Sequence, residues 1–468
     1  MYGIDVNDLR FRGETDSRTI QNAVDFAERE GITTVIVPRN NDRTGKNIWS
    51  IEKTILLPSS LTVILDDCHL RLADGVRENI FRNRNTWTQE GNTLAGEQHD
   101  IRIVGVGNAV LDGGEPNGLC EQLHRDHPDQ FPHMHVNLLV FFHNVRDFEV
   151  RNIHVVRSRW WALCFMFCRW GRISEIDCKM YGTLENQDGI DLRIGCEYIT
   201  IENITGITGD DTVALTALPR THDAFQAPLR VEGKRPDIHD ITIRNIISST
   251  HGCSLLRFLN TDGAAEYNIT VDGLKDTGAS ISGAAIFMDI STDIFTEKRH
   301  HTHEEFRNVV IRNVSTCAQH GLFITGAMQD VLIENVSTYG KCAMGLQFGV
   351  NFDCKNVTIQ NCSFRSDPET TDCVIHSNRD LLELQDELHF RHVRADRANY
   401  IFRVHEAKIE DFVYAEPAKG YFHPDRPDLP SAYGRYHRCA YGREITNRPA
   451  DNRFSGTLPP PAEDPFAK

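Results

Sequence analysis

The amino-acid sequence predicts an all-β fold: a single-stranded, right-handed parallel β-helix with a helix capping its N-terminal end. Two observations predict it, a short phrase that recurs along the chain and a second series of strand-like segments between its copies. The phrase is Val150-Arg151-Asn152-Ile153, Ile201-Glu202-Asn203-Ile204, Ile243-Arg244-Asn245-Ile246, Ile311-Arg312-Asn313-Val314, Ile333-Glu334-Asn335-Val336 and Ile359-Gln360-Asn361-Cys362. Periods of about 20–50 residues indicate a solenoid.

The asparagine of this phrase is expected at one corner of every turn of the coil. Asn335 follows Asn313 by 22 residues, and Asn203 follows Asn152 by 51, which is two turns with Asp177 in between. An asparagine at such a corner tolerates positive φ, and its amide can bond the amide of the next turn. The sequence therefore predicts an asparagine ladder.

A second series of short apolar segments alternates with the first. It comprises Leu138–Phe142, Trp161–Met166, Gly189–Ile194, Thr212–Thr216, Cys253–Arg257, Ala284–Asp289, Gly321–Thr325 and Gly345–Gly349. Short β-branched segments without a long helical pattern predict two or three strands per turn. A chain of 468 residues can then form one domain of about ten turns, because each turn buries its apolar face on the next. We expect this domain to span residues 1–416.

The two ends of the chain have different predicted roles. Residues 15–30 have an N-cap signal and apolar positions at helical spacing, and Gly31 follows. A helix at Asp16–Glu30 would cover the open edge of the first turn. Residues 417–468 are rich in Pro, Tyr, Arg and Asp, which predicts an irregular arm that wraps the coil or joins a second copy of the chain.

Charge and hydropathy exclude several kinds of partner. Acidic residues outnumber basic ones by 66 − 50 = 16, which argues against nucleic acids and anionic membranes. No stretch approaches the roughly 18 apolar residues of a membrane span. The first residues, Met1–Val6, have no basic and apolar leader pattern, so a cytoplasmic location is predicted. A secreted chain that has been trimmed would begin in the same way.

Cysteine and histidine usage favours no cofactor. The 13 cysteines form no evident paired framework, and several lie in apolar segments, so we expect reduced thiols.

Two insertions, Ala217–Asp237 and Ser291–Glu305, interrupt the repeat and are expected to form cleft walls. The second contains His300, His301 and His303, for which a solvated loop or a ligand-facing patch is favoured over a metal site.

Three carboxylates are placed where they can act together. Asp188 and the pair Asp210 and Asp211 precede successive strand-like segments, and Asp188 and Asp210 are 22 residues apart, about one turn. His251 precedes the next segment of the series and is expected at the same position one turn later. Each aspartate alone could be an ordinary turn residue. Together, clustered carboxylates can divide acid and base roles, because repulsion and unequal burial separate their pKa values.

The motifs resemble glycoside hydrolase family 28, the polygalacturonases and their relatives. Asn186-Gln187-Asp188-Gly189 is similar to the family's Asn-Thr-Asp-Gly, Gly209-Asp210-Asp211 matches its Gly-Asp-Asp, and Thr250-His251-Gly252 partly matches its Gly-His-Gly. Residues 106–113 and 158–163 are similar to flanking segments of the family. The resemblance covers about residues 10–365 and implies a pectin-lyase-like solenoid.

The resemblance also implies roles for the matching residues. Asp210 would protonate the leaving oxygen, Asp188 and Asp211 would deprotonate the attacking water, and the anomeric carbon would be inverted. His251 would orient the acid. Asn186, in the same motif as Asp188, is a candidate for substrate binding. No cofactor and no metal are expected.

The chain departs from the family where the sugar carboxylate would bind. The family's Arg and Lys are missing from the matching strand, residues 283–289, which instead ends in Asp289. Arg193 and Arg257 are the replacement cations that we consider, and Arg257 could equally pair with an acid such as Asp289. Trp160 and Trp161 could stack on a sugar or pack in the core.

The predicted function is that of an inverting glycoside hydrolase acting on a pectin-type or related oligosaccharide. The predicted cleft walls favour an exo-acting enzyme, which cleaves from a chain end. Two alternatives stay open: a hydrolase of a neutral glycan, since the cationic pair is absent, and a non-catalytic carbohydrate-binding β-helix. The expected partner is an oligosaccharide or polysaccharide, and the C-terminal arm is a candidate surface for self-association. A pectate lyase is disfavoured because its chemistry requires a calcium-binding carboxylate set.

Overall fold

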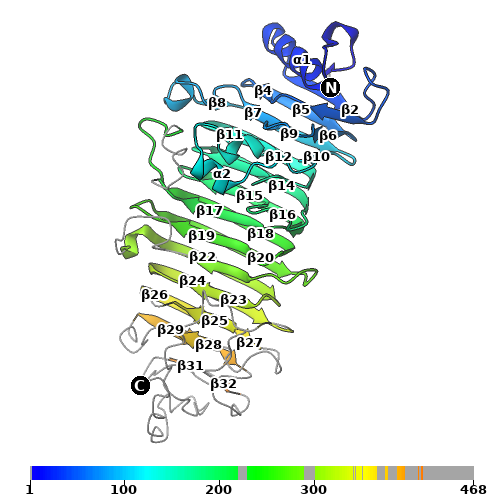
Figure 1. Cartoon of the computed structure of the whole chain (residues 1–468). Helices are drawn as coiled ribbons and strands as arrows, with labels where there is room; N and C mark the ends of the chain where they lie inside the picture. The colour runs from blue at the N-terminus through cyan, green and yellow to red at the C-terminus, as the bar shows by residue number, and fades with distance from the viewer. Residues whose placement is uncertain are drawn as a thin grey trace, which may run out of the picture.

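The chain forms a coil of parallel strands. The computed structural model describes residues 3–219, 229–288, 301–340, 342, 344–349, 351–365, 375–377, 387–395, 409–410 and 413–414. Figure 1 shows the strands stacked along one axis, from the N-terminal helix to the last described strands. The predicted arm, residues 417–468, lies outside the described residues.

The described strands belong to two parallel sheets. The larger sheet contains β1 (Ile4–Asp5), β2 (Thr34–Pro38), β3 (Ile48–Ile51), β5 (Leu61–Asp66), β6 (His69–Leu72), β8 (Gln98–His99), β9 (Ile101–Val106), β10 (Val110–Asp112), β12 (Val145–Val156), β14 (Arg169–Lys179), β16 (Glu197–Thr208), β18 (Ile238–Thr250), β20 (Glu266–Asp276), β22 (Phe306–Thr316), β24 (Ala327–Thr338), β26 (Asp353–Gln360), β27 (Ser363–Phe364), β29 (Leu388–Arg391), β30 (Arg394–Ala395), β31 (Ile409–Glu410) and β32 (Val413–Tyr414). The smaller sheet contains β4 (Ile55–Leu57), β7 (Phe81–Asn83), β11 (Val140–His143), β13 (Leu163–Met166), β15 (Ile190–Arg193), β17 (Val213–Ala217), β19 (Ser254–Asn260), β21 (Ala284–Met288), β23 (His320–Ile324), β25 (Met344–Phe348) and β28 (Ile375–Ser377).

The coil is held together by rows of buried aliphatic side chains. In the larger sheet, Ile199, Ile241, Ile269, Val309 and Val331 occupy equivalent positions on successive strands, and all five are buried. Each coil therefore covers the apolar face of the one before it, which is how a solenoid builds a continuous core.

The second series of predicted segments is confirmed. All eight coincide with strands of the smaller sheet, with boundaries that differ by at most a few residues. That sheet has 11 described strands, close to the ten turns expected from the repeat length. Inward positions such as Ile190 and Leu192 are buried in the core, so the residues that alternate with them, Asp191 and Arg193, face outward from the coil.

The asparagine ladder is also confirmed. Asn152, Asn203, Asn245, Asn313, Asn335 and Asn361 all have positive φ, between 54° and 60°. The side-chain amide of Asn245 donates to that of Asn203 (2.6 Å), and that of Asn335 donates to that of Asn313 (3.2 Å). One position is corrected: Glu175, with φ 52°, takes the corner between Asn152 and Asn203, whereas Asp177 lies two residues later in β14.

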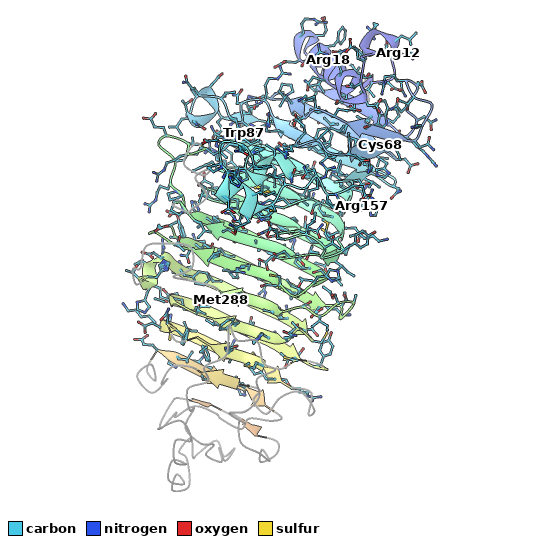
Figure 2. All side chains as sticks on the ribbon, viewed as in Figure 1. Arg12, Arg18, Cys68, Trp87, Arg157 and Met288 are labelled. Atoms are coloured by element: carbon cyan, nitrogen blue, oxygen red, sulfur yellow. The ribbon has the colours of Figure 1, made fainter. Side chains whose placement is uncertain are left out.

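The predicted cap is helix α1 (Asp16–Glu30). The Thr15 hydroxyl accepts a hydrogen bond from the N–H of Arg18, and Gly31 ends the helix with φ 67°. The buried Asp16 carboxylate accepts from the Ser50 N–H (2.8 Å) and pairs with Arg43 (2.6 Å), which fastens the helix to the first coils. Figure 2 places Arg12 and Arg18 at this end of the coil.

Short helices lie in the connections. They are η1 (Leu9–Phe11), η2 (Glu90–Asn92), α2 (Glu121–Asp126), η3 (Met134–Asn137) and η4 (His303–Glu305). No helix among the described residues is long and apolar enough to cross a membrane. The described cysteines are all free thiols, in agreement with the prediction.

A second hydrophobic cluster covers part of the outer face of the smaller sheet. We call it the outer cluster: Leu119, Met134, Leu138, Phe141, Trp160, Trp161, Cys164, Met166, Phe167, Ile194, Leu229 and Val231. Its members come from residues 119–138, from the insertion after β17, from the strands β11 and β13, and from residues that directly flank β13 and β15. Both segments therefore lie over the coils that precede Asp188.

Candidate active site

Two consecutive coils bring the predicted carboxylates to one corner of the molecule, and a third coil adjoins them. Residue Ile190 of β15 is level with Val213 of β17, which in turn is level with Leu256 of β19. Just before these strands, the N–H of Gly189 donates to the carbonyl oxygen of Asp211 (2.9 Å). Asp188 and Asp211 therefore lie side by side on neighbouring coils, as predicted.

Asp210 belongs to the same corner. Its N–H donates to the carbonyl oxygen of Gln187 (3.2 Å), so the Asp pair adjoins the residue before Asp188. The Thr208 hydroxyl donates to the carbonyl oxygen of Asp210 (2.7 Å) and contacts the hydroxyl of Thr212 (3.2 Å). These bonds fix the turn that carries the pair.

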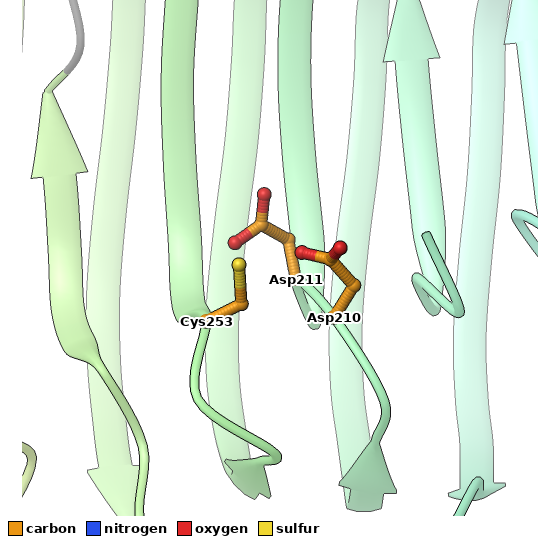
Figure 3. A group of neighbouring side chains, drawn as sticks. All are labelled: Asp210, Asp211 and Cys253. Atoms are coloured by element: carbon orange, nitrogen blue, oxygen red, sulfur yellow. The ribbon is translucent and has the colours of Figure 1, made fainter. Parts of the chain in front are cut away.

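A cysteine completes the cluster. One side-chain atom from each of Asp210, Asp211 and Cys253 lies within 4.8 Å of the other two, and Figure 3 shows the three side chains converging from adjacent coils. The backbone N–H of Ser254, the next residue, donates to Asp211 Oδ1 (2.8 Å). Burial and the two nearby carboxylates raise the pKa of Cys253, so its thiol stays protonated.

Burial governs the charge of the carboxylates. Asp188 and Asp211 are each 4% exposed, and Asp191 is 1% exposed. Burial, followed by repulsion from Asp191, Asp210 and Asp211, raises the pKa of Asp188 well above its usual value. Burial and then Asp210 raise the pKa of Asp211 to about 7, although Arg257 and bonds from Ser254 oppose the shift. The cluster therefore retains protons near neutral pH.

Asp191 is not among the residues predicted from the sequence, although it lies three residues after Asp188. Burial also raises its pKa well above the usual value, while Arg193 acts in the opposite direction. Neither of its carboxylate oxygens, nor Asp188 Oδ1, has a hydrogen-bond partner among the described residues. The corner thus contains polar atoms that the fold leaves unsatisfied, and such atoms are typical of functional sites.

Two arginines lie on the outer face beside the carboxylates. The Arg257 guanidinium is 4.0 Å from Asp211 and lies over the ring of Phe287, 4.7 Å from its centroid. That of Arg193 lies 4.2 Å from the ring centroid of Trp161. Phe287 is level with Arg257 on the next strand, β21, where the family would place cations. Asp289, expected to end this strand, lies outside the described residues.

His251 does not take the position expected for it. Its N–H donates to the carbonyl oxygen of Thr208 (3.0 Å), so it lies before the level of the Asp pair, and Cys253 takes the place beside Asp210. The exposed ring of His251 shares a hydrogen bond between Nδ1 and Ser280 Oγ (3.0 Å). A Cβ at Gly182 would lie 2.6 Å from that of His251, so the loop before Asp188 packs closely against this histidine.

The remaining predicted residues are placed as follows. Asn186 has φ 52° and is partly buried in the loop before Asp188. Trp160 and Trp161 are buried in the outer cluster, 3% and 5% exposed, which agrees with the packing alternative. Within the described residues, Asp210, Asp211 and Cys253 are also the group that could hold a metal ion, which the sequence did not predict. The rings of His124, His133 and His135 contact one another edge to face in the segment before β11.

Comparison with known proteins agrees with this geometry. Residues 52–221 match the model of glycosyl hydrolases family 28, a segment that includes all three predicted catalytic aspartates. No curated protein matches the chain.

Several solved structures share the fold at low sequence identity. An exopolygalacturonase from Thermotoga maritima has 15% identity and a TM-score of 0.54, covering 80% of this chain and 91% of its own. A polygalacturonase from Erwinia carotovora has 16% identity and a TM-score of 0.52, with coverages of 78% and 93%. The A-module of the mannuronan C-5 epimerase AlgE4 from Azotobacter vinelandii has 13% identity and a TM-score of 0.56, with coverages of 88% and 100%.

These neighbours confirm the predicted right-handed parallel β-helix. The family match adds the segment that carries Asp188, Asp210 and Asp211. The resemblance to glycoside hydrolase family 28 is thereby confirmed over residues 52–221, and the chain is consistent with a divergent member of that family.

Proposed function

We propose that the chain is an inverting glycoside hydrolase that cleaves a pectin-type or related oligosaccharide from one end. The observation that carries the proposal is the corner formed by Asp188, Asp210 and Asp211, where buried carboxylates keep protons near neutral pH. A glycosidase needs a protonated carboxyl group and an ionised one close together, and such a cluster supplies both.

The reaction uses the two forms in one step. The buried cluster holds its proton jointly, and this proton passes through Asp210, the residue that matches the family's acid, to the glycosidic oxygen as the bond to the anomeric carbon breaks. Asp188 and Asp211 hold a water molecule, whose proton passes to a carboxylate as its oxygen bonds to the anomeric carbon from the opposite face. The resemblance gives His251 the role of orienting the acid; its ring, bonded to Ser280, would do so from beside this corner rather than from the level of the Asp pair.

Cleavage from a chain end is supported by the outer cluster. Residues 119–138 and the pair Leu229 and Val231 cover the outer face of β11 and β13. A sugar chain lying on the outer face at Asp188 would meet this cover on one side. The exopolygalacturonase among the structural neighbours favours the same mode of action.

An acidic sugar is supported by Arg257. It lies on the strand that follows the Asp pair, within 4.0 Å of Asp211, and Arg193 is a second candidate cation. A guanidinium binds a carboxylate through charge-assisted hydrogen bonds. Because Phe287 replaces the expected cation on β21, a neutral glycan is the alternative substrate. A cytoplasmic location and self-association through residues 417–468 stay predictions from the sequence.

Release of reducing sugar tests the proposal. The wild-type protein is incubated with oligogalacturonates and with neutral galacto-oligosaccharides, and NMR identifies the anomer formed first. We expect end-wise release from oligogalacturonates with inverted configuration. Release from the neutral set alone would favour the alternative substrate, and no release from either would contradict the hydrolase.

A further inference from the structure

A second corner of the coil contains two exposed aromatic residues in an unusual conformation. On each of nine successive coils, one residue occupies this corner. Each of the nine comes directly after a residue of the larger sheet that is in register with its counterpart on a neighbouring strand, and all nine have φ between 50° and 57°. They are Asp100, Asp147, Trp170, Tyr198, Asp240, Asn268, Asn308, Asp330 and Asn356. Seven are aspartate or asparagine, which tolerate positive φ, whereas bulky residues rarely adopt it.

The Asp and Asn members have a structural reason to be there. The Asn268 amide donates to Asp240 (3.3 Å), that of Asn308 to Asn268 (3.2 Å), and that of Asn356 to Asp330 (2.6 Å). At Trp170 and Tyr198 these hydrogen bonds are missing, and no buried packing compensates for them, because the two side chains are 47% and 48% exposed. A strained conformation without a packing benefit points to function.

The two rings form a small continuous platform. Their centroids are 6.4 Å apart along the coil, with planes inclined by 30°. The Arg169 guanidinium lies 4.3 Å from the Trp170 centroid, and His239 contacts the Tyr198 ring at 5.7 Å. We call Trp170 and Tyr198 the aromatic platform. Trp170 and Tyr198 follow β13 and β15 respectively, so the platform belongs to the coils next to Asp188.

The charges around the platform are paired. Arg169 bonds Glu97 (2.7 Å), and His239 bonds both Glu197 (3.1 Å) and Asp240 (2.7 Å). The platform thus offers aromatic faces within a rim of paired polar groups. Two rings are too small an area for a stable protein interface, which buries about 800 Å² per partner. Successive pyranose rings, with apolar C–H faces and hydroxyl groups at their edges, fit such a surface.

We propose that the aromatic platform is a second carbohydrate-binding site, which holds a polysaccharide chain by stacking sugar rings on Trp170 and Tyr198. The choice of polymer rests on the proposed function, because we take the bound glycan to be the pectic polymer that the active site cuts. The existence of the binding site does not depend on that function. Because the surrounding charges are paired, binding depends little on salt concentration.

The test replaces both rings with the residue of the neighbouring corners. Trp170→Asn with Tyr198→Asn is made in an Asp210→Asn background, so that the polymer is not cut, and Trp87→Asn is the matched control. Trp87 also has positive φ (64°) and is 42% exposed, but lies in the N-terminal coils (Figure 2). Affinity electrophoresis measures binding of polygalacturonate and of neutral galactan at low and high salt.

We expect the double variant to bind at least one polymer about tenfold more weakly, with an unchanged or higher Tm. The control should bind as its parent does, and Tyr198→Phe should keep binding. Unchanged binding in the double variant, a parent that binds neither polymer, or a lower Tm would overturn the proposal. Loss of concentration-dependent self-association would assign the platform to a dimer and overturn it too. Binding is measured without hydrolysis. A protein that releases no sugar would therefore contradict the proposed function, whereas the binding result would still decide for or against the aromatic platform.

Discussion

Acidic and amide side chains gather at two kinds of corner in the coil, which differ in how far these side chains are buried and whether they are hydrogen-bonded. At the asparagine ladder the side chains are exposed or partly exposed, and the amide of Asn245 bonds that of Asn203 (2.6 Å). At the candidate active site Asp188, Asp191 and Asp211 are buried beside one another, and Asp191 has no hydrogen-bond partner in the described chain. The ladder stabilises the repeat, whereas the carboxylate corner opposes folding, as expected where function sets the residues.

The largest effect is expected from the carboxylates. Asp188→Asn and Asp210→Asn should each lower turnover by about 10²–10⁴, because a general acid or water-activating base is lost. Reducing-sugar release measures the effect, and circular dichroism should report an intact fold. Asp330→Asn is the matched control, since its exposed carboxylate accepts from Asn356 at a structural corner. Wild-type turnover in either active-site variant would make these carboxylates structural.

A smaller effect is expected at Arg257. Arg257→Ala should weaken binding of oligogalacturonates about ten- to hundredfold, the value of a charge-assisted hydrogen bond, and change binding of neutral oligosaccharides little. Titration calorimetry in the Asp210→Asn background compares the two ligands. Arg312→Ala removes an exposed partner of Asp272 on the larger sheet and should change neither. Equal losses for both ligands, or no loss, would favour a neutral substrate.

The smallest effect is expected at the asparagine ladder. Asn245→Ala should lower the free energy of unfolding by about 1–2 kcal/mol, because alanine is strained at φ 56° and the bond to Asn203 is lost. Asn245→Gly loses the bond alone and should cost less. Denaturant unfolding measures both, and kcat should not change. An alanine variant as stable as the glycine variant would mean that the positive φ carries no cost.

The repetitive part of the fold is predictable from the sequence. A repeat places the same residue type at the same level in every coil, so the spacing of 22 residues between Asn313 and Asn335 is enough to assign them to one corner. The three catalytic candidates follow for the same reason, since Asp188 and Asp211 are separated by one coil without a long insertion.

Insertions and substitutions set the limit of that reasoning. Cys253 and His251 follow Asp211 after the insertion at residues 217–237, and the sequence does not fix how many inserted residues leave the coil. The sequence therefore places His251 at the level of the Asp pair, whereas in the structure it lies before that level. For the same reason the sequence places Cys253 in an apolar segment rather than beside the aspartates. Trp170 and Tyr198 replace the Asp and Asn of their corner, so they carry no trace of the repeat.

The central claim is that the carboxylate corner gives up stability for a proton needed in catalysis, and Asp211→Asn tests it most directly. The folded pKa of Asp211, about 7, exceeds its reference value of 3.8, so the folded state binds more protons between these values and loses stability as pH rises through them. Asparagine removes this loss and can still accept from the Ser254 N–H. We expect a variant with strongly reduced turnover whose Tm exceeds that of the wild type at about pH 8, by more than at about pH 5. A variant less stable than the wild type at both pH values would contradict the claim.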